Sequence, residues 1–170
     1  MIEWFDNDEL FRQKLETGHR WARAVAERLQ AEGIDARLTP LRWRNSIDDR
    51  HRFRNEQDVV VNTDEGQYVI EVKSRDLDFD EEPSSYPYDT AYVDTVSGWD
   101  QKDREPTAVV LVSQLTGGML VVPVRKTRAH WRKVRNFDRR RSISDWWYEV
   151  DKQFLKPMSD LISWLATRSH

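Results

Sequence analysis

The fold of this chain is decided by QDVVVN (57–62), TDEG (63–66) and QYVIEVKS (67–74). The first and third segments are short runs rich in β-branched residues, which favour strands, and the middle segment has the composition of a turn. Two such runs joined by a short turn predict a β-hairpin. We therefore expect Asp58, where the first strand opens, to lie beside Glu71, near the end of the second.

Strand alternation predicts that Glu71 and Lys73 point to the same face of the sheet, with Val72 on the other. Charges near the end of a buried strand are costly unless they are paired or bind a metal. Two neighbouring carboxylates repel each other, and a divalent cation relieves that repulsion. Mg²⁺ prefers oxygen ligands, so Asp58 and Glu71 suit it, and we expect Mn²⁺ to substitute. Lys73 would orient the attacking water or stabilise charge on a phosphate.

Working outward from the hairpin, the chain predicts a mixed α/β domain with a central mixed sheet flanked by helices. Apolar residues at three- and four-residue spacings predict a long amphipathic helix over 8–32, and Gly33 is a suitable residue just after its end. Further strands are expected over 34–43, 107–114, 119–124 and 144–152, and Pro40 limits the first of these to an edge or irregular strand. A basic helix is expected over 125–136 and a closing helix over 157–167. Residues 44–56 are expected to form a loop, and 75–106 a long excursion that holds a short helix between 89 and 102.

Asp58 in EQDVVV, with Glu71 and Lys73 in YVIEVKS, resembles the PD-(D/E)XK nuclease superfamily, which has the restriction-endonuclease-like fold. The resemblance covers about residues 8–124 in element order. It implies that Asp58 and Glu71 bind Mg²⁺ and that Lys73 assists phosphodiester hydrolysis. The chain departs from the motif at Gln57, where the family pattern has proline, its most variable letter.

Members of this superfamily often add a glutamate from the first helix and a glutamine shortly after the lysine strand. Glu16 in KLETGHRWA and Gln101 in SGWDQK match those places. The resemblance therefore implies Glu16 as a further metal ligand and Gln101 as a further catalytic residue. Asp89, Asp94 and Asp100 are alternatives that could add a ligand, although their aromatic-rich segment also suits a packed cover over the sheet.

Two basic segments are candidates for DNA binding, because arginine binds phosphate bidentately and interleaved aromatics can stack on unpaired bases. The run 125–141 holds nine Lys or Arg residues and one acid, whereas 76–82 holds five acids and no base. The loop before Asp58 is also rich in arginine. The predicted contacts are Arg125, Lys126, Arg128, Arg132, Lys133, Arg139, Arg140 and Arg141 from the run, and Arg52 and Arg54 from the loop.

Composition bounds the class of protein. The 170 residues suggest one domain, and the absence of cysteine excludes disulfides, thiolate zinc sites and cysteine nucleophiles. The N-terminus carries too many charges for a signal peptide, and no apolar run is long enough to span a membrane, so we expect a cytoplasmic location and no membrane partner. The net charge of −3 does not by itself indicate a nucleic-acid binder.

The function predicted from the sequence is that of a Mg²⁺-dependent DNA endonuclease of the structure-selective or nicking kind, as in phage or DNA repair metabolism. RNA as a substrate stays open. Cutting two strands with one site per chain favours a homodimer. Two alternatives remain. The chain could be a non-catalytic nucleic-acid-binding or phage structural module that keeps the fold, or Glu71 and Lys73 could be a solvent-facing pair on an edge strand.

Overall fold

The predicted hairpin is present in the computed structural model, which describes residues 2–40, 58–138 and 142–169 (of 2–8, 10–12, 14–15 and 138 only the backbone). Strands β2 (Val59–Thr63) and β3 (Gly66–Arg75) pair antiparallel, with Val59 opposite Ile70 and Thr63 opposite Gly66. Gly66 has a φ of +130°, a backbone conformation that glycine adopts without strain, and so the turn closes tightly.

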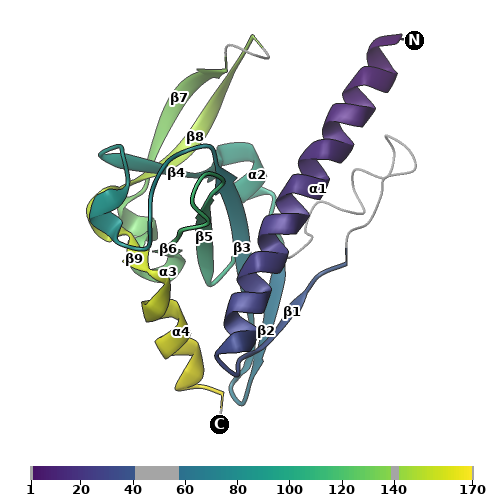
Figure 1. Ribbon diagram of the computed structural model, residues 1–170. Coiled ribbons are helices and arrows are strands. Elements are labelled where there is room, and N and C mark those ends of the chain that lie inside the picture. Colours follow the sequence, from purple (N-terminus) through teal and green to yellow (C-terminus); the bar gives the residue numbers. More distant parts are fainter. Residues whose placement is uncertain (1, 41–57, 139–141, 170) are drawn as a thin grey trace.

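The hairpin forms part of a six-stranded mixed sheet, here called the large sheet, with the order β1-β2-β3-β5-β6-β9 (Figure 1). Its pairs are antiparallel except for β3 and β5, which are parallel. The expected edge strand is confirmed, because β1 lies at one end of the order. The remaining strands are β1 (Asp35–Leu38), β5 (Ala108–Ser113), β6 (Met119–Pro123) and β9 (Lys156–Pro157).

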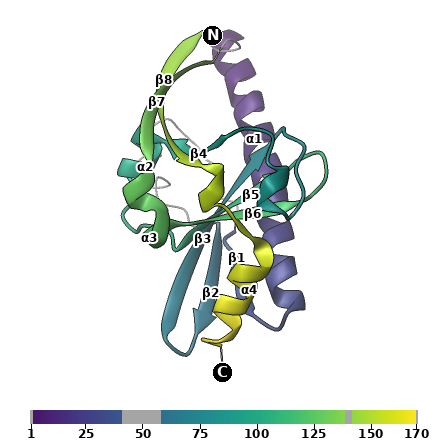
Figure 2. The same cartoon turned by 90° about the vertical axis from the view of Figure 1, so that its left-hand side faces the viewer.

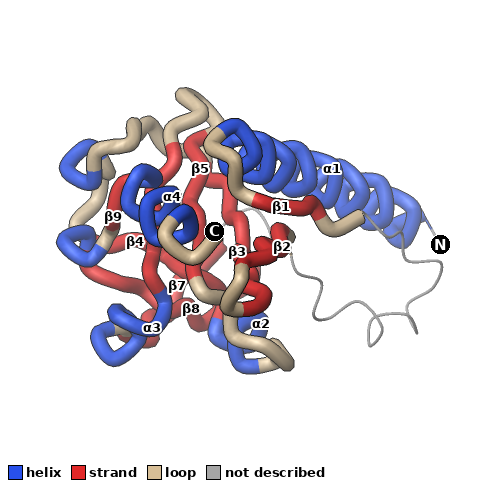
Figure 3. Tube along the Cα trace, turned by 90° about the horizontal axis from the view of Figure 1, so that it is seen from below, coloured by secondary structure: helices blue, strands red, loops and turns tan. Residues whose placement is uncertain are grey.

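One face of the large sheet is covered by helices. Helices α1 (Ile2–Ala31) and α4 (Met158–Ala166) bury an apolar core on this face, which includes Leu29, Val110 and Leu165. The first helix begins earlier than position 8, and it ends as predicted before Gly33, whose φ is +79°. Seen from below, α1 lies on one side of β3 and α2 (Val96–Asp100) on the other (Figure 3).

The opposite face of the large sheet is covered by a second sheet, which the sequence did not predict. This small sheet has the order β4-β8-β7 and is antiparallel (Figure 2). Strands β4 (Thr90–Thr95) and β8 (Ile143–Asp151) pack Val93 and Val150 onto Val109 and Leu111. The expectation of flanking helices therefore holds for one face of the large sheet. The other face, here called the inner face, lies between the large sheet and the small sheet.

The basic helix expected over 125–136 was wrong. The chain forms only α3 (Val124–Thr127) and a short 3₁₀ turn, η3 (Arg128–His130), and then enters β7 (Arg132–Asp138). The side chains of β7 point alternately to the two faces of the small sheet, and all seven of its residues pair with β8. Pairing with β8, the next strand along the chain, outweighs the weak local preference of arginine and lysine for helix.

Several other elements agree with expectation. A short helix, α2, lies within 89–102, and α4 begins directly after Pro157. Two further 3₁₀ turns, η2 (Pro83–Ser85) and η4 (Lys152–Phe154), complete the described elements. The arginine-rich loop over 44–56 lies outside the described residues. None of the helices in the described part of the chain combines the length and apolar composition needed to cross a bilayer.

Candidate active site

Glu71 and Lys73 lie on the inner face of the large sheet, between it and the small sheet. Their parallel neighbours on β5 are Val109 and Leu111, which belong to the core shared by the two sheets. Val72 points to the helix-covered face, as strand alternation predicts. Glu71 is buried, with 8% of its surface exposed, so its carboxylate needs compensation from neighbouring groups.

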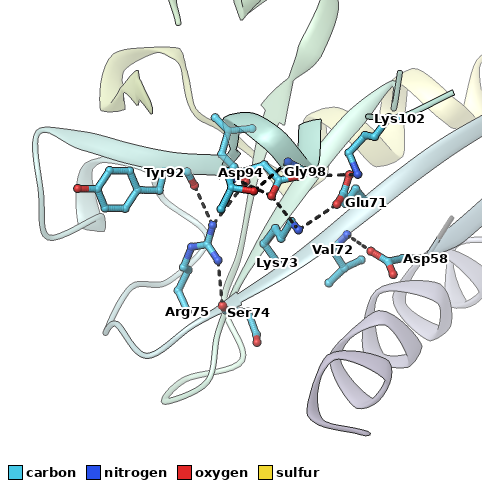
Figure 4. A network of polar contacts seen from close by, with 12 residues as sticks. Asp58, Glu71, Val72, Lys73, Ser74, Arg75, Tyr92, Asp94, Gly98 and Lys102 are labelled. Carbon is cyan, nitrogen blue, oxygen red and sulfur yellow. Dashed lines mark hydrogen bonds and ion pairs between the residues drawn. The ribbon is translucent and has the colours of Figure 1, made fainter. Parts of the chain in front are cut away.

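Four charged side chains, Glu71, Lys73, Asp94 and Lys102, meet at this point, and Asp58 lies beside them, bonded to the Val72 backbone (Figure 4). The five are here called the charge cluster. The Lys73 ammonium lies 3.0 Å from Glu71 Oε1 and 3.3 Å from Asp94 Oδ1. The Lys102 ammonium lies 2.7 Å from Glu71 Oε2 and 3.7 Å from Asp94 Oδ2. Each lysine therefore bridges the carboxylates of the two sheets.

A β-bulge brings Asp94 into the charge cluster. Tyr92 pairs with Glu149 and Asp94 with the next residue of β8, Tyr148, so Val93 is the extra residue of β4. Val93 and Asp94 are both buried as a result, with 0% and 6% of their surfaces exposed. Bulges of this kind re-aim side chains and are frequent beside active sites.

Asp58 is held at the edge of the cluster by the backbone of β3. Its Oδ2 accepts a hydrogen bond of 2.8 Å from the Val72 N–H. Burial raises the pKa of Asp58 to about 6; the Val72 N–H and the lysines oppose this rise, and the Glu71 carboxylate adds to it. Asp58 is thus the carboxylate for which charge is least well compensated in the absence of a bound cation.

Glu71 and Lys73 stay charged despite their surroundings. Burial alone would raise the pKa of Glu71, but the Lys73 and Lys102 ammoniums outweigh it, and the pKa is lowered. Burial alone would lower the pKa of Lys73, but Glu71 and Asp94 outweigh it, and that pKa is raised. The raised pKa keeps the Lys73 ammonium protonated at neutral pH, where it can donate hydrogen bonds.

The charge cluster offers oxygen ligands to a divalent cation, although its charges are already balanced. Three carboxylates stand against two ammonium groups and the buried guanidinium of Arg75, which also interacts with Asp94 and Glu71. Asp94 Oδ2 is buried and accepts no hydrogen bond, so one hard oxygen is available inside the cluster. Among residues 2–40, 58–138 and 142–169, however, no group of three or more His, Cys, Asp or Glu side chains is already arranged around a metal position. A cation would be held by Asp58 and Glu71, with a small movement of side chains or with water as the other ligands.

The two residues implied by the resemblance alone lie differently. Glu16 is exposed on α1, the helix that covers the face opposite Glu71. Gln101 is exposed at the end of α2, and its backbone N–H donates to Ser97 and Trp99. The next residue, Lys102, is the one that enters the charge cluster. Sequence reasoning missed Lys102, because only the fold of the 75–106 segment brings it to Glu71.

The predicted DNA contacts that the structure describes are exposed. Arg125 and Lys126 lie on α3 and Lys133 on β7. Arg128 pairs with Glu105, and Arg132 pairs with Asp151 at 2.7 Å, so these two cations already have acidic partners. The other predicted contacts, Arg52, Arg54, Arg139, Arg140 and Arg141, lie outside the described residues.

Gly98 at the start of α2 leaves room for the Asp94 carboxylate. A Cβ at this position would lie 2.7 Å from Thr95 Oγ1 and 3.3 Å from Asp94 Oδ1. We expect Gly98→Ala to lower the free energy of unfolding by about 1–3 kcal/mol, because the added methyl overpacks the cap of the helix. Urea titration followed by circular dichroism measures the change.

The matched control for this substitution is Gly18→Ala. A Cβ at Gly18, in the interior of α1, would meet no atom within 4 Å. This substitution should stabilise the protein by roughly 0.5–1 kcal/mol through helix propensity. Equal effects of the two substitutions would contradict a steric requirement at Gly98. The open space also means that no other group packs so closely on α1 at Gly18 that a glycine is required there.

A search of protein-family models and of curated proteins finds no match to this chain.

Proposed function

We propose that this chain is a Mg²⁺-dependent DNA endonuclease with the restriction-endonuclease-like fold. The observation that carries the proposal is the position of Asp58, directly before β2, beside Glu71 and Lys73, which lie on β3 at the inner face of the large sheet. Asp58 bonds to the backbone of β3 one residue after Glu71, and Lys73 lies 3.0 Å from Glu71. Two carboxylates and an ammonium in this order supply metal ligands and a donor to phosphate.

The residues divide the chemistry among them. Asp58 and Glu71 would hold Mg²⁺, with Mn²⁺ as a substitute, and Asp94 offers a further oxygen from the small sheet. Bound Mg²⁺ polarises a phosphoryl oxygen and lowers the pKa of a coordinated water. The Lys73 ammonium donates hydrogen bonds to that water or to the phosphate as negative charge develops. Burial by the two sheets strengthens each of these interactions.

The arrangement of elements supports the same proposal. Over residues 8–124, a long helix is followed by the antiparallel strands β1, β2 and β3, and then by β5 parallel to β3. This retains the element order on which the resemblance rests. Family analogy adds three further proposals: a structure-selective or nicking activity, a homodimer for cutting both strands, and a cytoplasmic location.

A cleavage assay tests the proposal. Supercoiled plasmid and branched DNA are incubated with the protein in Mg²⁺, in Mn²⁺ and in EDTA. We expect cleavage with either metal, none in EDTA, and a loss of at least about 100-fold in Glu71→Gln, which keeps shape but removes a ligand charge. Asp64→Asn, in the exposed hairpin turn, is the control and should cut at the wild-type rate. Metal-independent cleavage would sink the proposed site.

A second function has a specific observation in its favour. Both oxygens of Glu71 are engaged by lysines, at 3.0 and 2.7 Å, so the charge cluster could be a purely structural link between two sheets. The chain would then be a non-catalytic nucleic-acid-binding or phage structural module. Binding of DNA without cleavage in every metal, together with no calorimetric signal for Mn²⁺ binding, would favour this second function.

A further inference from the structure

The face of the small sheet that carries Asp94 continues without interruption into the β7–β8 hairpin. Asp94 is paired with Tyr148 on β8, and Tyr148 is paired with Lys133 on β7. Paired residues of an antiparallel sheet share a face, so these three side chains form one row. Because β4 ends at Thr95, opposite Trp147, the residues of β8 before Trp147 pair with β7 alone, and the β7–β8 hairpin extends beyond β4 (Figures 1 and 2).

The uncovered part of this face combines cations with aromatic rings. Beyond the Tyr148–Lys133 row come the pairs Trp146–Arg135 and Ser144–Phe137. Trp146 is 50% exposed and Phe137 is 55% exposed, which is unusual for side chains of this size. These side chains are here called the ribbon face: Lys133, Arg135, Phe137, Ser144, Trp146 and Tyr148.

Charge is sorted between the two faces of the hairpin. The described side chains of the ribbon face include two cations and no acid. The other face carries Asp145, Glu149 and Asp151, with Arg132 paired to Asp151 and Glu149 at 2.7 and 3.5 Å. Solubility alone does not require positive and negative side chains to lie on different faces of a hairpin, whereas a surface that binds a polyanion does.

We propose that the ribbon face binds an unpaired nucleic-acid strand and leads it to the charge cluster. Arg135 and Lys133 would contact phosphates, and Trp146 and Phe137 would stack on bases, whose faces are accessible only where the strand is unpaired. The Trp146 row lies two residues from the Asp94 row, about 7 Å along the strand, or about two nucleotide steps of stacked chain. A base held by Trp146 would therefore lie close to the cleaved bond.

This inference rests on the proposed function for the nature of the substrate, but its test does not require cleavage. Binding is measured in EDTA by fluorescence anisotropy, with labelled (dT)₂₀, (rU)₂₀ and a 20-base-pair duplex as probes. We expect the wild type to bind one of the single strands at least tenfold more tightly than the duplex. Tighter binding of (dT)₂₀ assigns DNA, and tighter binding of (rU)₂₀ assigns RNA.

Substitutions on the ribbon face should act in two distinct ways. Trp146→Ala should weaken binding of the preferred strand by about 5- to 100-fold, whereas Trp146→Phe should stay within about threefold because it retains a stacking ring. Arg135→Gln should reduce the slope of log K against log salt by about 0.7, the loss of one phosphate contact with a single strand. Thermal melting of each variant verifies that the hairpin still folds.

Arg132→Gln is the matched control. Arg132 was among the contacts predicted from the sequence, but it lies on the opposite face of the same strand and is paired with Asp151 and Glu149, which argues against a contact with nucleic acid. The substitution should leave the affinity within about twofold and the salt slope unchanged. Equal or tighter binding of the duplex, no binding of any probe, or equal effects of Arg132→Gln and Arg135→Gln would overturn the inference. Binding of a single strand without any cleavage in the plasmid assay would support the binding role of the ribbon face and contradict the proposed nuclease function. The failure of one proposal can therefore be told from the failure of the other.

Discussion

Replacing Asp58 with asparagine should abolish metal-dependent cleavage and at the same time stabilise the metal-free protein. Asparagine keeps an oxygen that can accept the Val72 N–H bond but removes the negative charge that the site uses to hold Mg²⁺. We expect the cleavage rate to fall by about 10³-fold, because both the metal and its activated water are lost. The stability gain follows from the raised pKa of Asp58.

The direction of the stability effect depends on pH. Burial raises the pKa of Asp58 from 3.8 to about 6, so the folded, metal-free protein favours the protonated carboxyl. The contribution of the Asp58 carboxyl to the free energy of unfolding is fully present below about pH 4 and is lost as the pH rises through 6. Asp58→Asn does not titrate. Its advantage in free energy of unfolding should therefore grow between pH 4 and 7 and reach about 3 kcal/mol.

Urea denaturation at several pH values, in EDTA and in excess Mg²⁺, measures both effects. Mg²⁺ at 100 times its Kd should stabilise the wild type by about 2.7 kcal/mol and leave Asp58→Asn unchanged. Asp64→Asn, in the hairpin turn, is the control for removing an aspartate charge from the same hairpin. Destabilisation by Asp58→Asn at pH 7 in EDTA would mean that the Asp58 charge is already compensated in the metal-free protein.

Replacing Lys73 with methionine should remove catalysis while leaving strand binding intact. Methionine keeps most of the volume of the lysine stem but has no donor for the phosphate. Loss of one such donor typically lowers kcat by 10² to 10³-fold, and we expect a loss near the upper end, because Lys73 lies on the strand of Glu71. Single-turnover cleavage measures the rate, and anisotropy in EDTA measures binding, which should stay within about threefold.

Lys102→Met is the matched control, since Lys102 also pairs with both Glu71 and Asp94 but comes from the end of α2 rather than from β3. Its ammonium competes with a cation for Glu71 Oε2. We therefore expect the Mg²⁺ concentration for half-maximal cleavage to fall several-fold in Lys102→Met, with a maximal rate closer to that of the wild type. If Lys102→Met loses cleavage and Lys73→Met retains it, the catalytic ammonium is that of Lys102.

The part of the site that is local in the chain could be predicted from the sequence. The 63–66 turn fixes the register of the hairpin, and the alternation of β3 fixes the faces of Glu71 and Lys73. Both are short-range effects of turn chemistry and strand geometry. The strands over 107–114 and 119–124 were equally visible as apolar runs, and the structure has them as β5 and β6.

The small sheet could not be predicted in the same way. Strand β4 pairs with β8 more than 50 residues later in the chain, and its bulge at Val93 leaves no signature in the local sequence. Lys102 depends on that pairing for its position. The error over 125–136 has a different origin. The partner of β7 is the next strand, β8, but arginine and lysine suit a helix as well, and the alternation of β7 is apparent only once Trp146 and Tyr148 are known to lie opposite it.

The division of the charge cluster between two sheets has a consequence for how the protein is made. Asp58, Glu71 and Lys73 come from one hairpin, over residues 58–75, whose two strands are neighbours in the chain. Asp94 is positioned only when β4 pairs with Tyr148 and Trp147, near the C-terminal end of the chain. A nascent or truncated chain thus holds an unfinished centre. The set of five charged side chains is complete only after β8 has been synthesised and has paired with β4.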